Sequence, residues 1–389
     1  MTESVALEAL ITEIQQIYGE GPIPLHRPVF AGNERRYVVE CIDSNFVSSV
    51  GARVTEFEER VAEYTGAAHA VATVNGTAAL QVALRLAGVT HGDEVVTQAV
   101  TFVATCNALA QLGALPVFVD VDLTTMGMSP DALSAWLRAN AETRANGSFN
   151  RTTGRRIAAC VPMHTFGHPC RIVELANVCE SWGIPLVEDA AESLGSRVSD
   201  RHTGCFGLMG TLSFNGNKVI TTGGGGMLLT NNAKLAARAK HLTTTAKRPH
   251  PYEFFHDEVG YNYRLPNLNA ALGCAQMETL PKMLRAKAAI AERYKAVCGR
   301  LGIRFVEAAP HAQSWLNAIV LDSAEQRDWF LRVSNDRGVM TRPIWRLMSA
   351  LPAFEHCQHD GLAHSIWLEQ RVVNIPSGVP DAMIRSLVV

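Results

Sequence analysis

The sequence predicts an α/β fold in which a mostly parallel seven-stranded sheet is covered by helices and followed by a smaller α+β domain. The chain has 389 residues, more than one hydrophobic core usually organises. Apolar residues make up 47% of it and charged residues 19%, a composition typical of a well-packed globular protein. Between about residues 30 and 250, short β-rich runs alternate with helical patterns. This alternation is typical of parallel strands buried beneath helices on both faces.

Seven short apolar runs are the expected strands of the sheet. They cover residues 69–74, 94–97, 116–121, 157–162, 184–188, 211–214 and 226–230. Helical patterns lie between most of them, for example at 77–87, 102–112 and 172–182. A polar stretch at 140–156 is expected to be a surface loop.

The chain is expected to divide at about residues 30 and 255. Residues 1–30 form an amphipathic helix and an arm, 31–255 the large domain, and 256–389 the small domain. In the small domain a long helix covers 268–301, with a break expected at Pro281. A strand at 314–321 and a helix at 324–337 follow, with short β runs near Val339 and Val372.

Charge and composition exclude several classes of protein. The net charge is −2 and no basic stripe is present, which argues against nucleic-acid binding. No apolar run approaches the roughly 20 residues that span a bilayer, and the N-terminus does not resemble a signal peptide. The nine cysteines form no C-x-x-C pair or zinc-binding spacing. We therefore expect reduced thiols, no metal site, no membrane contact and a cytoplasmic location.

Lys218 lies between a short strand and a run of four glycines, in the segment Ser-Phe-Asn-Gly-Asn-Lys that begins at Ser213. An isolated lysine in such a place is usually an exposed side chain beside a turn. The glycine run lacks the spacing of a nucleotide-binding loop and leads into a strand instead of a helix. The segment is therefore a candidate site of a different kind.

Two further segments follow strand ends. Glu188 and Asp189 end an apolar strand, and ligands of open α/β sheets bind beyond such ends. A helix N-cap is the alternative role for one of these acids. Gly76 and Thr77 begin a helix directly after another strand, and free N–H groups at a helix start bind phosphate. Thr77 is the expected cap of that helix.

Together these three segments resemble the DegT/DnrJ/EryC1/StrS family of sugar aminotransferases, which have the type I aspartate-aminotransferase fold. The resemblance covers nearly the whole chain, from Pro24-Leu25-His26-Arg27-Pro28 to Asn374-Ile375-Pro376-Ser377. The sequence segments around Lys218 and Asp189 are most similar to those of the branch of bacillosamine-, legionaminic-acid- and perosamine-pathway enzymes. That branch aminates C4 of nucleotide-linked 4-keto-6-deoxy sugars.

The resemblance implies pyridoxal 5′-phosphate as cofactor. Lys218 would hold it as a Schiff base and then move protons as general base and acid. Asp189 would face the pyridine nitrogen and keep it protonated, so that the ring can accept electrons. The other implied cofactor contacts are Gly76, Thr77, Phe102, Glu192, Ser213 and Asn262. An ordinary core aromatic is the alternative for Phe102.

The resemblance also implies substrate contacts and a homodimer. The expected substrate contacts are Ser48, Ser49, His164, Arg264, Arg342 and Trp345. A buried structural histidine is the alternative for His164, and a packed tryptophan for Trp345. In relatives the asparagine matching Asn262 reaches the cofactor of the neighbouring subunit, so the active sites would be shared.

The implied reaction transfers an amino group from L-glutamate to the sugar. The preferred acceptor is UDP-linked 4-keto-6-deoxy-N-acetylglucosamine, and a GDP-linked acceptor giving perosamine is the alternative. A dehydratase on the same fold uses histidine in place of the lysine, and Lys218 argues against it. A non-catalytic regulator would be expected to lose Lys218 or Asp189, and both are present.

Overall fold

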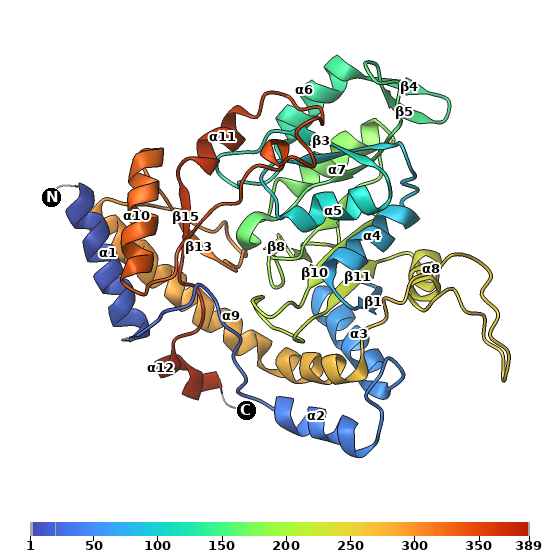
Figure 1. The fold of residues 1–389 in the computed structure, drawn as a ribbon, viewed down its shortest axis with the longest axis horizontal. Helices are drawn as coiled ribbons and strands as arrows, with labels where there is room; N and C mark the ends of the chain where they lie inside the picture. Colours follow the sequence, from blue (N-terminus) through green and yellow to red (C-terminus); the bar gives the residue numbers. More distant parts are fainter. Residues whose placement is uncertain (1–2, 20, 388–389) are drawn as a thin grey trace.

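The computed structural model describes residues 3–19 and 21–387 (Figure 1). All seven expected strands of the large sheet are present, most within one or two residues of the expected bounds. They are β1 (His69–Thr73), β2 (Glu94–Gln98), β3 (Leu115–Val119), β6 (Ile157–Val161), β7 (Val187–Asp189), β10 (Met209–Ser213) and β11 (Gly226–Thr230). Each is a short apolar run whose residues are almost entirely buried, as expected of strands covered on both faces.

The strands follow the order β1-β11-β10-β7 and β3-β2-β6, and isolated bridges between Cys160 and Leu186 and between Met163 and Asp189 join the two halves. Among the described residues, β11 is the only strand that runs antiparallel in this sheet. The predicted mostly parallel seven-stranded sheet is confirmed. The register places Thr211 beside Asp189 and Ser213 beside Gly226, so the ends of β7 and β10 meet at one edge.

Helices cover both faces of this sheet. One face packs on α4 (Gly76–Leu86), α5 (Val103–Gln111) and α8 (Ala233–Thr243). The other packs on α3 (Ala52–Thr65), α6 (Pro130–Asn140), α7 (Ile172–Ser181) and part of α9 (Asn267–Leu301). Neighbouring residues of one strand enter different clusters, as strand geometry requires: Leu228 faces α4, whereas Met227 faces α9.

The smaller sheet is antiparallel, with the order β12-β13-β15-β14. Its strands are β12 (Arg304–Phe305), β13 (Asn317–Val320), β14 (Arg342–Pro343) and β15 (Val372–Ile375). Helices α1 (Glu3–Tyr18) and α10 (Ala324–Asp336) pack with it, and Figure 1 shows them side by side near the end of α9. Five apolar residues of α1 (Leu7, Leu10, Ile11, Ile14 and Ile17) are buried in this cluster. The remaining elements are α2 (Glu34–Asp43), α11 (Ala363–Glu369), α12 (Asp381–Ile384), β8 (Arg197–Val198) and β9 (Arg201–His202).

Two local expectations were wrong. Residues 140–156 contain a hairpin, β4 (Ala141–Arg144) and β5 (Gly147–Asn150), in place of an irregular loop. Its polar residues bond inward, because Asn150 donates to Glu94 and Ser148 to the carbonyl of Trp182. Helix α9 also continues through Pro281, although proline has no N–H to donate within the helix, and residues on both sides of it are buried.

The chain divisions expected at residues 30 and 255 stay a prediction. Helix α9 joins both parts, since it packs on α2 and α3 at one end and on α1 at the other. All nine cysteines are buried and unpaired. Within residues 3–19 and 21–387, none of the helices combines the length and apolarity needed to cross a membrane.

Candidate active site

A cavity of about 820 Å³ lies where the edge of the large sheet faces loops of the small sheet. It gathers residues from β7, β10, α4 and β14, which are far apart in the sequence. Nine of the fourteen predicted site residues line it: Gly76, Thr77, Phe102, Asp189, Glu192, Ser213, Lys218, Arg342 and Trp345. Ligands of open α/β sheets bind at such an edge.

Lys218 lies in the loop between β10 and β11. The loop closes on itself, since the N–H of Phe214 donates to Gly225 and that of Thr222 to Phe214. The amine of Lys218 lies 3.2 Å from a carboxylate oxygen of Glu192 and 3.7 Å from the ring centre of Trp315. A lysine held between an acid and an aromatic ring inside a cavity is not an ordinary surface lysine.

Glu192 is fully buried beside Lys218. Its second carboxylate oxygen accepts a hydrogen bond from the N–H of Phe166 at 2.9 Å. Burial raises the pKa of Glu192 to about 7, although the charge of Lys218 acts in the opposite direction. This carboxyl group can therefore gain or lose a proton near neutral pH, next to the amine.

Asp189 ends β7 and is almost fully buried at the cavity wall. The hydroxyl of Thr105 donates to one of its carboxylate oxygens at 2.8 Å, and the N–H of Ala191 donates to the other at 3.2 Å. Thr105 is itself bonded to Thr101. These contacts fix the orientation of the carboxylate before any ligand binds.

The start of α4 forms a cradle of N–H groups against Ser213. Asn75, and not Thr77 as expected, is the N-cap, since its side chain accepts from the N–H of Ala78 at 2.8 Å. A Cβ atom on Gly76 would lie 3.0 Å from that of Ser213, and one on Gly226 would collide with the backbone of Asn75. Glycine at both positions lets three segments meet closely around a helix N-terminus, a preferred site for phosphate.

Aromatic rings border the cavity on opposite sides. Phe102 precedes α5, lines the cavity and is 51% exposed, so it is not a core residue and is free to stack on a ligand. On the small-domain side, Trp345 packs on Phe166 with ring centres 4.9 Å apart. Trp345 is both a packed aromatic and part of the cavity wall.

The cavity residues that sequence reasoning missed include His26, Trp315, Arg346 and Asn374. The indole N–H of Trp315 donates to the carbonyl of Asn217 at 2.7 Å and so fixes the ring next to Lys218. His26 and Asn374 belong to the two end segments that carry the family resemblance, and that was the available signal.

His164 does not line the cavity, which corrects its assignment as a substrate contact. Its ring is fully buried. One ring nitrogen lies 3.1 Å from a carboxylate oxygen of Glu188, and the other accepts from the N–H of Cys170 at 3.2 Å. With both nitrogens engaged inside the domain, His164 holds the ends of β6 and β7 together and cannot touch a substrate.

Ser48, Ser49, Asn262 and Arg264 also lie outside the cavity of this chain. Ser48 is exposed in the loop between α2 and α3, and its carbonyl accepts from the N–H of Asn267. Asn262 is exposed, whereas Arg264 forms a backbone bridge with Thr73 at the end of β1. The buried Nε atom of Arg264 has no hydrogen-bond partner. These residues can reach an active site only if it belongs to another subunit.

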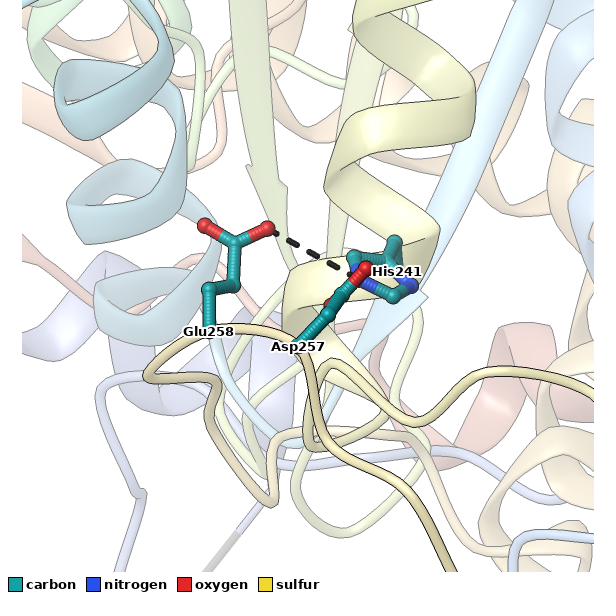
Figure 2. Close-up of side chains that lie close together, drawn as sticks. All are labelled: His241, Asp257 and Glu258. Atoms are coloured by element: carbon teal, nitrogen blue, oxygen red, sulfur yellow. Dashed lines mark hydrogen bonds and ion pairs between the residues drawn. The ribbon is translucent and has the colours of Figure 1, made fainter.

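The cluster of His241, Asp257 and Glu258 has a composition that suits metal ions (Figure 2). His241 lies 2.7 Å from Asp257 and 3.7 Å from Glu258. Arginines neutralise the two acids, however, since Arg248 bonds Asp257 at 2.8 Å and Arg238 bonds Glu258 at 2.6 Å. The hydrogen bond from Arg248 lowers the pKa of Asp257 to about 2, helped by His241. The cluster is an ion-pair network that anchors the segment after α8.

A paired lysine, a fixed carboxylate and a phosphate cradle at one sheet edge define a pyridoxal-phosphate-dependent transferase. The residues fit the cofactor: Gly76, Thr77 and Ser213 would hold its phosphate, Asp189 its pyridine nitrogen, and Phe102 its ring face. The residues of this site follow the ends of three separate strands, so only the folded chain brings them together.

Comparison with known proteins gives the same answer. Residues 29–381 match the model of the DegT/DnrJ/EryC1/StrS aminotransferase family, and the chain belongs to that family. The chain is 37% identical to EpsN of Bacillus subtilis over 336 residues, which cover 86% of this chain and 84% of EpsN. It is 33% identical to GDP-perosamine synthase of Vibrio cholerae over 381 residues, covering 94% and 97% of the two chains. The structure of the aminotransferase TlmJ from Streptoalloteichus hindustanus superposes with a TM-score of 0.84 at 29% identity, covering 95% and 97%.

Proposed function

We propose that this enzyme transfers an amino group from L-glutamate to C4 of a GDP-linked 4-keto-6-deoxy sugar. One observation carries the proposal: the cavity has the cofactor-holding residues on one wall and Arg342, Trp345 and Arg346 on the other. The second wall offers positive charge and an aromatic face beyond the reacting centre, as a nucleotide diphosphate requires. Binding energy from the nucleotide can then hold the C4 ketone in place.

The relatives favour the GDP-linked alternative over the UDP-linked acceptor that the sequence suggested first. GDP-perosamine synthases of Vibrio cholerae and Escherichia coli O157:H7 are 33% and 34% identical to this chain and align over more than 90% of it. We therefore place the GDP-linked sugar first and keep the UDP-linked N-acetyl sugar as the comparison substrate.

When bound, pyridoxal phosphate supplies a carbonyl group that carries the amine and a ring that accepts electrons. The protein's own residues do the rest. Lys218 moves a proton to or from the reacting carbon, and Glu192, 3.2 Å away, holds the amine in position. Asp189, oriented by Thr105, provides the negative charge that keeps the ring nitrogen protonated.

A half-reaction tests the acceptor. The enzyme is loaded with amine from glutamate, a keto compound is added, and the visible absorbance of the lysine-bound cofactor is followed as it returns. We expect GDP-4-keto-6-deoxymannose to restore it fastest, with the UDP-linked N-acetyl sugar slower and oxaloacetate much slower. If oxaloacetate is as fast as every nucleotide sugar tried, the enzyme is a general aminotransferase and the proposal fails.

We further propose that the functional unit is a homodimer with shared sites. Large apolar side chains are exposed on α2 and the segments before and after it, and on the segment after α8 that projects from the body in Figure 1. They are Phe30, Val39, Ile42, Phe46, Val47 and Val50 in the first group, and Tyr252, Phe254, Phe255 and Val259 in the second. A second copy of this chain would cover them and bring Asn262 to the neighbouring cofactor.

Complementation tests the shared site. Lys218→Ala and Asn262→Ala subunits are each expected to be inactive, because each variant lacks one of the two residues that every site requires. Mixed and allowed to exchange, they should regain activity, since one of the two sites of the hybrid has both residues. The mixture is assayed against each variant alone, with the size of the assembly measured by light scattering. A fully active monomer contradicts the dimer, and an active Asn262→Ala enzyme contradicts the assignment of Asn262.

A further inference from the structure

His26 lines the cavity and has no role in the reaction described above. Its segment is fixed to the small domain, because the carbonyl of Leu25 accepts from the N–H of Ser377 at 2.7 Å. A Cβ atom on Gly378 would lie 3.3 Å from the backbone nitrogen of Arg27, so the two segments are in close contact. The position of His26 is therefore set by the fold and not by a mobile arm.

The ring of His26 has unused hydrogen-bonding capacity. Its Nδ1 atom is buried and has no partner. Burial lowers the pKa of His26 well below 6.5, and the positive charges of Lys287 and Lys218 lower it further. A neutral imidazole offers one donor and one acceptor, which suits a neutral polar group of a ligand.

Asn374 provides a second unused group on the same wall. It lies in β15 directly opposite Arg342 of β14, so the two side chains share one face of the small sheet. Asn374 is 3% exposed and lines the cavity, yet its side-chain nitrogen has no partner. An unpaired buried amide is costly, and two such groups in one cavity indicate that a ligand completes them.

We propose that His26 and Asn374 form a sugar-reading subsite that binds the ring hydroxyl groups of the acceptor and so determines which sugar is aminated. The inference rests on the proposed function. A 4-keto-6-deoxy hexose keeps free hydroxyl groups at C2 and C3, and each can donate to the imidazole nitrogen and accept from the amide. Glutamate carries carboxylates and no hydroxyl group that could donate to the imidazole nitrogen, so we expect its half-reaction to depend little on His26.

The fixed backbone around the subsite supports a role in selection. The amine of Lys287, in α9, is fully buried and donates to the carbonyls of Trp315 at 2.9 Å and Ser377 at 2.7 Å. It thereby ties the loop beside Lys218 to the segment that carries Asn374 and supports His26. A site that must discriminate between hydroxyl arrangements needs groups held at fixed positions.

The test compares two substitutions at His26. His26→Leu removes both hydrogen-bonding atoms, whereas His26→Gln keeps a donor and an acceptor. For His26→Leu we expect kcat/KM for the keto-sugar to fall about tenfold. The rate of the glutamate half-reaction should stay within about twofold. Calorimetry should show that the amino-sugar nucleotide product also binds more weakly, by a factor similar to the fall in kcat/KM. His26→Gln should restore most of it, and His91→Leu, at an exposed histidine outside the cavity, is the matched control.

Acceptors lacking the C2 or the C3 hydroxyl identify the contact. The wild-type enzyme should use one of them about tenfold less well than the parent sugar, whereas this preference should shrink in His26→Leu, in which Asn374 is the remaining contact. Asn374→Ala should likewise weaken binding of the sugar and leave the rate of the glutamate half-reaction nearly unchanged. If wild-type enzyme accepts all three sugars equally, or if His26→Leu retains the full preference, the subsite is wrong. If a variant fails to fold, the comparison of the three sugars with the wild-type enzyme decides the question by itself. If wild-type enzyme aminates no nucleotide sugar at all, the proposed function fails instead.

Discussion

Lys218→Ala is expected to abolish turnover while leaving the protein folded. The reaction needs an amine that exchanges with the incoming amino group and moves the proton, and no other lysine lines the cavity among the described residues. Removal of the side chain leaves Glu192 buried without its partner. Because the charge of Lys218 is what lowers the pKa of Glu192, that pKa rises further and Glu192 becomes neutral, so the fold loses little stability.

Single-turnover absorbance with glutamate measures the loss, and thermal melting followed by circular dichroism measures stability. Lys295→Ala is the matched control, since Lys295 is exposed and pairs with Glu307 at the surface. Addition of a small primary amine should restore part of the activity of Lys218→Ala. Transamination by this variant at near the wild-type rate, without added amine, would reject Lys218 as the essential amine.

Asp189→Asn is expected to lower the rate by several orders of magnitude. The substitution keeps the size of the side chain, and the Thr105 hydroxyl can still donate to the amide oxygen, whereas the N–H of Ala191 loses its acceptor. A neutral amide cannot hold the pyridine nitrogen protonated, and the ring then accepts electrons poorly. The effect should appear in the rate of proton transfer from glutamate, and much less in cofactor binding.

Rapid mixing with glutamate and with α-deuterated glutamate checks this expectation. The isotope effect should grow in Asp189→Asn, because proton transfer becomes fully rate-limiting. Asp131→Asn is the control, since Asp131 is exposed and pairs with Arg171 on the surface. A loss of less than tenfold, about 1.4 kcal/mol of barrier, contradicts the pairing with the ring nitrogen.

The large sheet could be predicted because each of its strands is a short apolar run bounded by turn residues. Lys218 and Asp189 were identifiable because both follow such strands, and strand ends of parallel sheets meet at one edge. The hairpin at 140–150 was missed because its sequence is polar. Its buried side chains bond to Glu94 and Trp182, which lie far away along the chain.

The other errors have a similar origin. Nothing local distinguishes a histidine that is held by Glu188 from one that faces a substrate, and His164 was therefore misplaced. His26 and Asn374 are nearly 350 residues apart, and only the packing of both chain ends on the small sheet brings them to the wall of the cavity. Asn75 caps α4 in place of Thr77 because the helix begins at Gly76, one residue before the expected start at 77.

The packing of α1 has a consequence for the order in which this protein is made. Its apolar side chains are buried against α9 and against Ile319, Val373 and Ile375, so a helix that is translated early completes its packing only when the last strand is translated. At about 5 to 20 residues per second, the interval between residues 18 and 375 lasts roughly 20 to 70 seconds. During that time the ribosome carries an exposed apolar helix, a surface on which nascent chains aggregate and chaperones act. Moving the coding sequence of α1 to the 3′ end of the gene, behind a linker, would bring the helix and its partners out of the ribosome together.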